Sequence, residues 1–489
     1  MPPSTQTGFP SKGCHNCRRR RLRCDKSYPA CHKCSNSGEE CLGYGAVLRW
    51  ANAPAIRGKL AGYAPFTAPA PGTLSGPVQP TKEKIELPEE HEGTRGWEQT
   101  PLTPSAFLTD PLLNHLNRAS RHYVHHFNTS VCRDLVSIDQ NSRNPFRIMI
   151  PLISRFPYLE ALVIATSAMH LATMHRYQGR SAHTELVDAL AAKDKAIRSL
   201  RAAISHSTPA SQAMVLVAIV FFINLDLIDS GKGGWKAHIT AAGSLIASLQ
   251  HNDLDASLVP LADAIAADCL TYRILGSTVN GGEAMPDADI SVLTRMQAHS
   301  YHCCPPAILQ IILSASQLGP EDSEQAMALL CRARALDVRD WVNSIRGLSA
   351  QDDLQVRVGI ASAHRATACL YACLVVPAVG GHVPAEMQPD GLVLEILEHL
   401  ATVPVDHALL KGTVWPTFMA GAQTDDVVWR GWCLDRLRAV WTKNPWICPW
   451  GYIRTATEML EKIWDGRAAL DGRNWLQQLK GSKDNCLIV

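Results

Sequence analysis

Apolar residues recur at helical spacing along most of the chain. Between about residue 112 and residue 479 they return every three or four positions, and Gly or Pro ends most runs. The clearest stretches are residues 158–170, 185–203, 212–228, 323–341 and 353–374. No run alternates apolar and polar residues as a half-buried strand does. The pattern predicts an all-α domain of a dozen or more helices over residues 112–480.

The longest apolar run lies at residues 213–223 and is followed by the polar residues Asn224 and Asp226. A bilayer-spanning helix needs about 20 apolar residues. We therefore expect a buried core helix here, and no membrane partner.

Residues 42–111 have a different composition. Pro, Thr, Gly and Ala are frequent, which is typical of a flexible linker. Pro54, Pro65 and Pro69 would interrupt any heptad pattern, so no coiled coil is expected there. The predicted organisation is mostly α: a small domain at residues 14–41, a linker at 42–111 and a large helical domain at 112–480.

Six of the sixteen cysteines form a repeat with the order C-x2-C-x6-C-x6-C-x2-C-x6-C. They are Cys14, Cys17, Cys24, Cys31, Cys34 and Cys41. A shift of 17 residues places the first three on the last three, so each half offers three thiolates. Zn²⁺ takes four tetrahedral ligands, and two ions need eight ligand positions. Six sulfurs supply eight positions only if two of them bridge, and the repeat predicts such a cluster of two Zn²⁺.

Three other interpretations of the cysteines are open. A four-cysteine zinc ribbon would use Cys14, Cys17, Cys31 and Cys34 and would leave two cysteines of the repeat without a role. A knot of three disulfides fits the even number, but the first residues have no apolar segment typical of a secretory signal, so we expect a reducing compartment. Chance clustering is the third, and the binuclear cluster is favoured over all of them.

Charge is divided unevenly along the chain. The formal net charge is +2, yet residues 1–49 carry nine Lys or Arg against three Asp or Glu, which leaves the rest acidic. A basic N-terminal segment on an acidic body indicates a polyanionic partner. Five arginines lie between Cys17 and Cys24, a stretch we expect to form about two turns of helix held at both ends by metal.

The segment CHNCRRRRLRCDKSYPACHKCSNSGEEC resembles the fungal binuclear zinc-cluster (Zn2Cys6) transcription factors. The resemblance implies that Cys14 and Cys31 bridge the metals and that Pro29 turns the chain between the halves. It also implies that Arg20 and Arg21 face a CGG-type triplet, where most relatives carry lysine at one or both places. Arginine can bind guanine O6 and N7 through two hydrogen bonds.

Three further basic residues, Arg18, Arg23 and Lys26, are expected to contact phosphates, which position a protein on DNA without specifying sequence. The general alternative for such a run is a nuclear-localisation signal or a solvated face. Because metal ligands enclose the run, DNA contact is favoured, and one segment can serve both roles.

The order of residues from HLNRASRHYVHHFNTSVCRDL to GWKAHITAAGSLI is similar to the fungal-specific regulatory domain that follows the zinc cluster in one branch of the family. The GYGAVLRW tract after the cysteines is similar to the branch that includes acriflavine sensitivity control proteins. The resemblance implies a nuclear RNA polymerase II transcription factor that regulates a secondary-metabolite gene cluster or a drug or stress response. Its expected partners are double-stranded DNA and transcriptional machinery or co-regulators.

Two alternative classes remain beside this one. A non-DNA-binding adaptor would use the zinc cluster structurally, and the arginines argue against it. An enzyme would need a nucleophile motif, cofactor loop or metal triad in the helical region, and the sequence offers none, so no enzyme is expected.

Four features of the helical region have structural explanations that we favour. His122 and His126 have a zinc-like spacing without a third ligand, and residues 231–235, GKGGW, lack the length of a phosphate loop. The adjacent Cys303 and Cys304 could sense oxidants but are expected to be buried. The terminal CLIV has an unusual last residue for a prenylation signal.

One cluster covers about three base pairs, so affinity must come from a second half-site or from flanking contacts. Without a coiled coil, either the helical domain dimerises or Arg49, Arg57 and Lys59 extend the contacts of a monomer. We favour the monomer.

Overall fold

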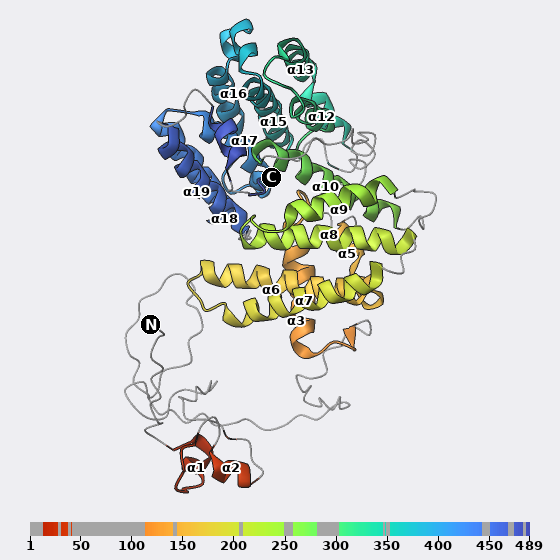
Figure 1. Cartoon of the computed structure of the whole chain (residues 1–489), viewed down its shortest axis with the longest axis vertical. Helices are drawn as coiled ribbons and strands as arrows, with labels where there is room; N and C mark the ends of the chain where they lie inside the picture. The colour runs from red at the N-terminus through yellow and green to blue at the C-terminus, as the bar shows by residue number, and fades with distance from the viewer. Residues whose placement is uncertain are drawn as a thin grey trace, which may run out of the picture. The chain divides into compact units, whose positions relative to one another are not determined.

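The computed structural model describes residues 13–27, 31–37, 41, 113–139, 144–204, 209–248, 258–280, 303–345, 348, 353–442, 450–467, 474–482 and 486–489. The chain divides into two units, residues 1–98 and 99–489 (Figure 1). The predicted linker at 42–111, Pro29 and the basic residues Arg49, Arg57 and Lys59 lie outside the described residues.

The first unit contains two one-turn helices, α1 (His15–Arg19) and α2 (His32–Asn36). The first half of the second unit has the elements α3 (Arg118–His126), η2 (Phe127–Val131), α4 (Cys132–Asp134), α5 (Pro145–Ile148), η3 (Ile150–Arg155), α6 (Pro157–Tyr177), α7 (His183–Ile204), α8 (Pro209–Asp229), α9 (Trp235–Ser248) and α10 (Val259–Val279).

The second half continues with α12 (Pro306–Ala315), α13 (Ser323–Ala335), α14 (Val338–Ser344), α15 (Leu354–Val375), η5 (Pro377–His382), η6 (Ala385–Met387), α16 (Pro389–Ala401), η7 (Ala408–Thr413), α17 (Val414–Gln423), α18 (Val427–Thr442), α19 (Gly451–Gly466) and α20 (Trp475–Gly481). Within the described ranges no strand occurs, and the predicted mostly α fold is confirmed.

Within the second unit the helices pack in layers. Figure 1 shows α6 and α7 side by side, with α8 lying next to them and then α9 and α10. Farther along, α15 packs against α12, α13, α16 and α17, and α19 reaches back to α8. The core therefore runs through the whole unit, and α8 and α15 lie at its centre.

Two helical segments, Ser211–Asp229 of α8 and Leu354–Val375 (α15), are long and apolar enough to cross a membrane by length and composition alone. In the most apolar 18 residues of each helix, 89% of the first and 83% of the second are buried, so both are core helices. The expectation of a buried helix around residues 213–223 is confirmed.

One predicted helix is wrong in its extent. Residues 323–341 form two helices, because the chain becomes extended at Leu336 (ψ 117°) after α13. The carboxylate of Asp337 then caps α14 by accepting a hydrogen bond from the backbone N–H of Asp340 at 2.9 Å. Periodicity alone hid this break, since the apolar spacing continues across it.

The outer face of α7 carries an apolar stripe. Val187, Leu190, Ile197 and Ile204 are 49%, 54%, 44% and 54% exposed. They lie on one side of the helix, while its other side packs on α6. This stripe is one apolar surface that a dimer formed through the helical unit could use.

The GKGGW segment forms the tight turn between α8 and α9. Gly231 has φ +71°, and a Cβ there would lie 2.5 Å from Cβ of Tyr452 and 2.9 Å from Sγ of Cys486. Glycine is required at this position because α19 and the C-terminal residues approach the turn closely. The segment thus has a packing role.

Candidate metal centre and nucleic-acid interface

The cysteine repeat in the sequence is also a repeat in three dimensions. Cys14 precedes α1, and its sulfur accepts a hydrogen bond from the backbone N–H of Cys17 at 3.4 Å; Cys31 precedes α2 and accepts from Cys34 at 3.4 Å. The third sulfur of each half is held in the same way. The N–H of Cys14 donates to Sγ of Cys24 at 3.4 Å, and the N–H of Cys31 donates to Sγ of Cys41 at 3.5 Å.

The sulfurs gather into two groups of four. One group contains Cys14, Cys17, Cys24 and Cys31, and the other contains Cys14, Cys31, Cys34 and Cys41; within each, all the Sγ atoms lie within 4.8 Å of one another. Cys14 and Cys31 belong to both groups. This geometry matches the arithmetic of eight positions from six sulfurs, because each shared sulfur is within reach of two metal positions.

The distances between sulfurs suit tetrahedral zinc. The Sγ atoms of Cys14 and Cys31 are 3.5 Å apart, and the pairs Cys14–Cys34 and Cys17–Cys31 are each 3.7 Å apart. Two thiolates bound at about 2.3 Å to one tetrahedral Zn²⁺ would be about 3.8 Å apart. The donor set, its number and its spacing therefore fit two zinc ions.

The clustered thiols can all be deprotonated only when a cation lies beside them. Burial raises the pKa of Cys14 to about 12 and raises the pKa of Cys31 further. At Cys24 burial also raises the pKa, but hydrogen bonds from the backbone N–H groups of Cys14 and Lys26 lower it more, to about 7. Four-coordinate Zn²⁺ supplies the positive charge that thiolates at these positions require.

Asp25 is a structural residue of the cluster that sequence reasoning missed. Its carboxylate accepts hydrogen bonds from the backbone N–H groups of His32 at 3.0 Å and Lys33 at 3.3 Å, in the first turn of α2. The hydroxyl of Ser27 also donates to it, and these contacts hold the pKa of Asp25 well below its usual range. Asp25 thus ties the first half to the second. An acidic residue directly after the third cysteine was the available signal.

The basic residues lie on the surface of this unit. Arg18, Arg20, Arg21 and Arg23 are exposed and Lys26 is partly exposed. The expectation of two helical turns from Cys17 to Cys24 is wrong, because α1 ends at Arg19 and Arg21 adopts φ +55°. The N–H of Leu22 still reaches the carbonyl of Cys17 at 2.8 Å, which closes the turn. The exposed arginines therefore lie at the end of α1 and in the tight turn that follows it.

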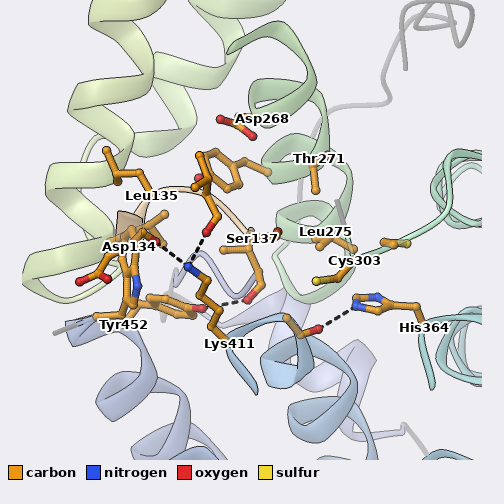
Figure 2. A pocket seen from close by; sticks show the side chains of 17 residues that line it. Asp134, Leu135, Ser137, Asp268, Thr271, Leu275, Cys303, His364, Lys411 and Tyr452 are labelled. Carbon is orange, nitrogen blue, oxygen red and sulfur yellow. Dashed lines mark hydrogen bonds between the residues drawn. The ribbon is translucent and has the colours of Figure 1, made fainter. Parts of the chain in front are cut away.

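The helical unit contains a cavity of about 140 Å³ that several distant segments line (Figure 2). Cys303 and Cys304 lie in its wall and are 7% and 3% exposed. Burial raises the pKa of both thiols, to about 11 for Cys303, which keeps them protonated and unreactive at neutral pH. The expectation that this pair is buried is confirmed.

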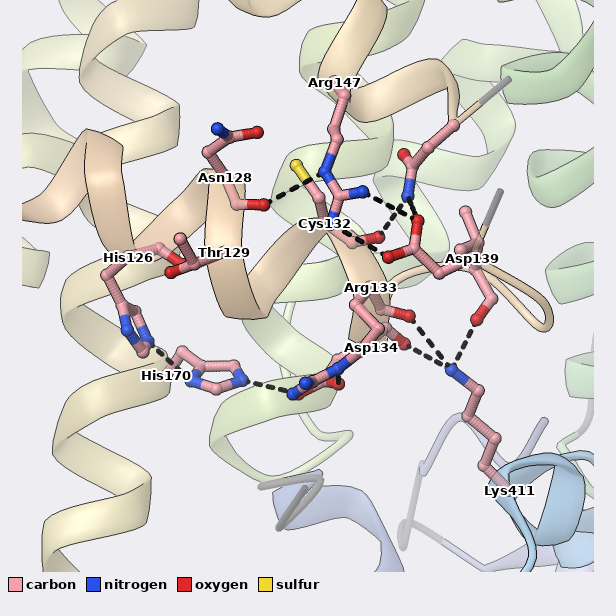
Figure 3. A network of polar contacts seen from close by, with 12 residues as sticks. His126, Asn128, Thr129, Cys132, Arg133, Asp134, Asp139, Arg147, His170 and Lys411 are labelled. Atoms are coloured by element: carbon pink, nitrogen blue, oxygen red, sulfur yellow. Dashed lines mark hydrogen bonds and ion pairs between the residues drawn. The ribbon is translucent and has the colours of Figure 1, made fainter. Parts of the chain in front are cut away.

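A polar network joins α3, α4 and α6 (Figure 3). His126 pairs with His170 through Nε2 and Nδ1 at 3.0 Å, and Nε2 of His170 lies 3.0 Å from the carboxylate of Asp134. Burial and the neighbouring His170 lower the pKa of His126 to about 3. His126 is thus directed to His170, and the His122–His126 pair forms no metal site among the described residues.

The ammonium group of Lys411 binds the backbone at the end of α4, next to this network. It donates hydrogen bonds to the carbonyls of Arg133 at 3.3 Å and Asp134 at 3.2 Å, and also to the carbonyl of Val136. Figure 3 shows the lysine reaching from η7 across to this segment. A residue more than 270 positions away therefore holds the chain after α4 in place.

The last residues are part of the core. Cys486, Leu487 and Ile488 are each 0% exposed. Asn280 donates to the carbonyl of Cys486 at 2.8 Å and accepts from its N–H at 3.2 Å. A prenyl transferase could not reach this thiol in the folded protein, which agrees with the preference against a prenylation signal.

A cluster of six sulfurs, two of which are placed to serve two tetrahedral metals, lies beside exposed arginines in a chain whose described second unit is helical. These features define a zinc-cluster regulator that binds DNA. Comparisons with known proteins agree. The fungal Zn(2)-Cys(6) binuclear cluster domain matches residues 12–50, and the fungal specific transcription factor domain matches residues 122–488. The chain belongs to the fungal-specific transcription factors with an N-terminal Zn(2)-Cys(6) cluster. Its cluster domain binds two zinc ions and DNA.

Two relatives are informative. The acriflavine sensitivity control protein acr-2 of Neurospora crassa is 46% identical, with 100% of this chain and 99% of the relative aligned. The aspercryptin biosynthesis cluster-specific transcription regulator atnN of Emericella nidulans is 44% identical over 43 residues, which cover 9% of this chain and 7% of its own. No solved structure matches the chain.

Proposed function

We propose that this regulator acts in the nucleus as an RNA polymerase II transcription factor and recognises a CGG-type triplet through one zinc cluster. The observation that carries the proposal is the pair of four-sulfur groups that share Cys14 and Cys31, next to exposed arginines. In this proposal the six cysteines of the repeat are the zinc ligands, and the two shared residues bridge the ions.

The charges of the cluster explain why the arginines are needed. Six thiolates and two Zn²⁺ together carry about −2. Such a core alone would repel phosphate. The exposed Arg18, Arg20, Arg21 and Arg23, with Lys26, reverse the sign of the surface around it. We assign base contacts to Arg20 and Arg21, and phosphate contacts to the other three.

The proposed domains are a DNA-binding domain at residues 14–41, a linker at 42–111 and a regulatory domain at 112–480, on which the described residues 486–489 pack. The regulatory domain would receive a signal or bind transcriptional machinery or co-regulators. The relative named for acriflavine sensitivity aligns over the whole chain, which supports a role in a drug or stress response. The relative named for a biosynthesis cluster aligns only over a short segment, which gives weaker support to a secondary-metabolite pathway.

For oligomeric state we propose binding as a monomer, with Arg49, Arg57 and Lys59 adding contacts beside the triplet. The alternative is a dimer through the helical unit, for which the exposed stripe of α7 offers an apolar surface. Binding of residues 1–62 and of the full chain should be compared on one CGG site and on an inverted pair. Specific binding of the fragment to the single site supports the monomer, whereas binding of only the full chain, and only to the pair, supports the dimer.

The test of the DNA-binding function is a titration of the zinc-loaded full chain with duplexes that contain or lack the triplet, over a range of salt concentrations. A DNA-binding cluster should lose affinity steeply as salt rises, because counterions are released when arginines contact phosphates. Affinity that does not depend on salt or on the triplet would favour an adaptor that uses the cluster only structurally.

A further inference from the structure

The cavity in the helical unit is assembled from segments that are distant in sequence. Residues 134–137, helix α10, residues 303–304, His364 of α15 and the region around Lys411 all contribute to its wall (Figure 2). None of these residues belongs to the zinc cluster. The cavity is therefore a feature of the helical unit alone and is independent of metal binding.

A buried hydrogen-bond acceptor lines this cavity. Nε2 of His364 lies 2.9 Å from the carbonyl oxygen of Gly412, and since a carbonyl only accepts, Nε2 carries the hydrogen. The other ring nitrogen, Nδ1, then keeps its lone pair, is buried and has no hydrogen-bond partner among the described residues. Burial lowers the pKa of His364 to about 4, so the ring is neutral at physiological pH. A neutral ring with a free lone pair accepts a hydrogen bond from a donor.

A second buried polar atom without a hydrogen-bond partner in the described part of the chain lies on α10. Oγ1 of Thr271 in α10 is buried and has no hydrogen-bond partner within the described residues, and its side chain lines the cavity. Asp268 lies one turn earlier in α10 and also faces the cavity. Burial raises the pKa of Asp268 to about 8, so this carboxyl is largely protonated near pH 7.

The charged groups nearby are already occupied. The ammonium of Lys411 is held by three backbone carbonyls, and the carboxylate of Asp134 pairs with His170 at 3.0 Å and Arg133 at 3.2 Å. The two cavity atoms with unmet hydrogen-bonding capacity, Nδ1 of His364 and Oγ1 of Thr271, are thus uncharged. A ligand that carried a formal charge would lose its hydration without gaining an opposite charge from them.

Size and shape limit the ligand further. A cavity of about 140 Å³ is close to the engineered cavity of about 150 Å³ that holds benzene. Tyr272, Trp450 and Tyr452 contribute aromatic surface to the wall. Aromatic side chains favour a flat ring through edge or offset contacts. The space accommodates one ring with a small substituent.

We propose that this cavity is a binding site for a neutral single-ring molecule that donates hydrogen bonds, namely a phenol or an aromatic amine. Its hydroxyl or amino group donates to Nδ1 of His364 or to Oγ1 of Thr271, and its ring packs against the aromatic wall. Bound there, the molecule contacts the segment after α4, helix α10 and η7 together, and it therefore stabilises their packing.

The experiment uses the zinc-loaded full chain and three probes, phenol, aniline and toluene, with binding followed by ligand-detected NMR and calorimetry. The three probes have similar size, and only toluene lacks a donor. Phenol or aniline should bind with a Kd of about 1 mM or tighter. Toluene should bind about tenfold more weakly, because it leaves the buried acceptor unpaired.

Two variants and a matched control locate the site. Thr271→Val removes the hydroxyl with little change in shape, and His364→Phe removes the acceptor while keeping a ring to stack on Trp415, whose centroid lies 5.6 Å away. Thr173→Val is the control, because Thr173 also has a buried hydroxyl without a partner among the described residues but does not line the cavity. At least one of the two site variants should weaken phenol binding about tenfold, and the control should bind as the parent does.

Three results would overturn the proposal. The first is absence of phenol and aniline binding to the folded parent chain. The second is equal affinity for toluene and phenol, and the third is unchanged phenol affinity in both site variants that remain folded by circular dichroism. Each readout is independent of DNA binding, so its failure is distinct from failure of the DNA-binding proposal.

Discussion

Replacing Cys31 should damage the cluster about twice as much as replacing Cys41. Structural zinc contributes about 10 to 16 kcal/mol in small zinc-finger peptides, or about 2.5 to 4 kcal/mol for each of four ligands. Cys41 belongs to one four-sulfur group and Cys31 belongs to both. Cys41→Ala therefore removes one ligand contact, worth about 2.5 to 4 kcal/mol, and Cys31→Ala removes two, worth about 5 to 8 kcal/mol.

The assay is elemental analysis of the purified full chain, combined with competition against a graded series of zinc chelators. The parent chain should hold two zinc ions, and Cys14→Ala should behave like Cys31→Ala because Cys14 is also shared. Cys303→Ala is the control, since this buried cysteine lies in the helical unit. Equal zinc loss in Cys31→Ala and Cys41→Ala would refute the bridging assignment, and one zinc per parent chain would refute the binuclear cluster.

Three further predictions concern other parts of the molecule. Arg21→Ala should lower affinity for the preferred triplet by about 1 to 3 kcal/mol, whereas Arg18→Ala should weaken all duplexes alike and lower the salt slope by about one; equal losses on specific and random DNA would contradict these roles. Burial raises the pKa of Glu395, but His399, whose Nε2 lies 3.7 Å from the carboxylate, and hydrogen bonds from Arg334 at 2.7 and 2.6 Å lower it more, to about 2. Its depressed pKa contributes stability above pH 4.5 that is lost as pH falls toward 2, so Glu395→Gln should destabilise the parent by about 2 to 3 kcal/mol at pH 7 and by much less at pH 3 in urea unfolding. Lys411→Met should raise amide hydrogen exchange at residues 133–136, while exchange in α6 and α7 stays unchanged; exchange that rises everywhere would show that Lys411 acts on the whole fold.

The sequence predicted the features that depend on local spacing. The cysteine repeat gave the number of sulfurs and their duplication, and apolar periodicity located α7, α8 and α15 within about three residues at each end. It located the start of α6 but ended that helix at residue 170, whereas α6 continues to Tyr177. The break between α13 and α14 was missed because a single capping residue, Asp337, decides it while the apolar spacing continues. The turn at Arg21 was missed for a similar reason, since nothing in an arginine run marks a left-handed residue.

Contacts between distant residues could not be predicted. His170 meets Asp134 across 36 positions, and Lys411 reaches the same segment across more than 270. Such pairs depend on how helices pack, and a single sequence contains no signal for that packing. The cavity is of this kind, because the residues in its wall come together only after α10, α15 and η7 have assembled.

The buried C-terminal residues have a consequence for synthesis of the protein. The backbone N–H of Cys486 donates a hydrogen bond to the side chain of Asn280, and the N–H of Leu487 donates to the carbonyl of Gly231 at 2.9 Å. The hydroxyl of Tyr452 donates to the carbonyl of Val489 at 2.9 Å. These residues leave the ribosome after every helix that the structure describes has been made. The zinc cluster can fold early in translation, whereas the helical unit cannot complete its core until residue 489 has emerged. A nascent chain could therefore carry a metal-loaded DNA-binding domain before its regulatory domain has closed. A chain whose synthesis stops near residue 480 would keep that DNA-binding domain beside an unfinished regulatory domain.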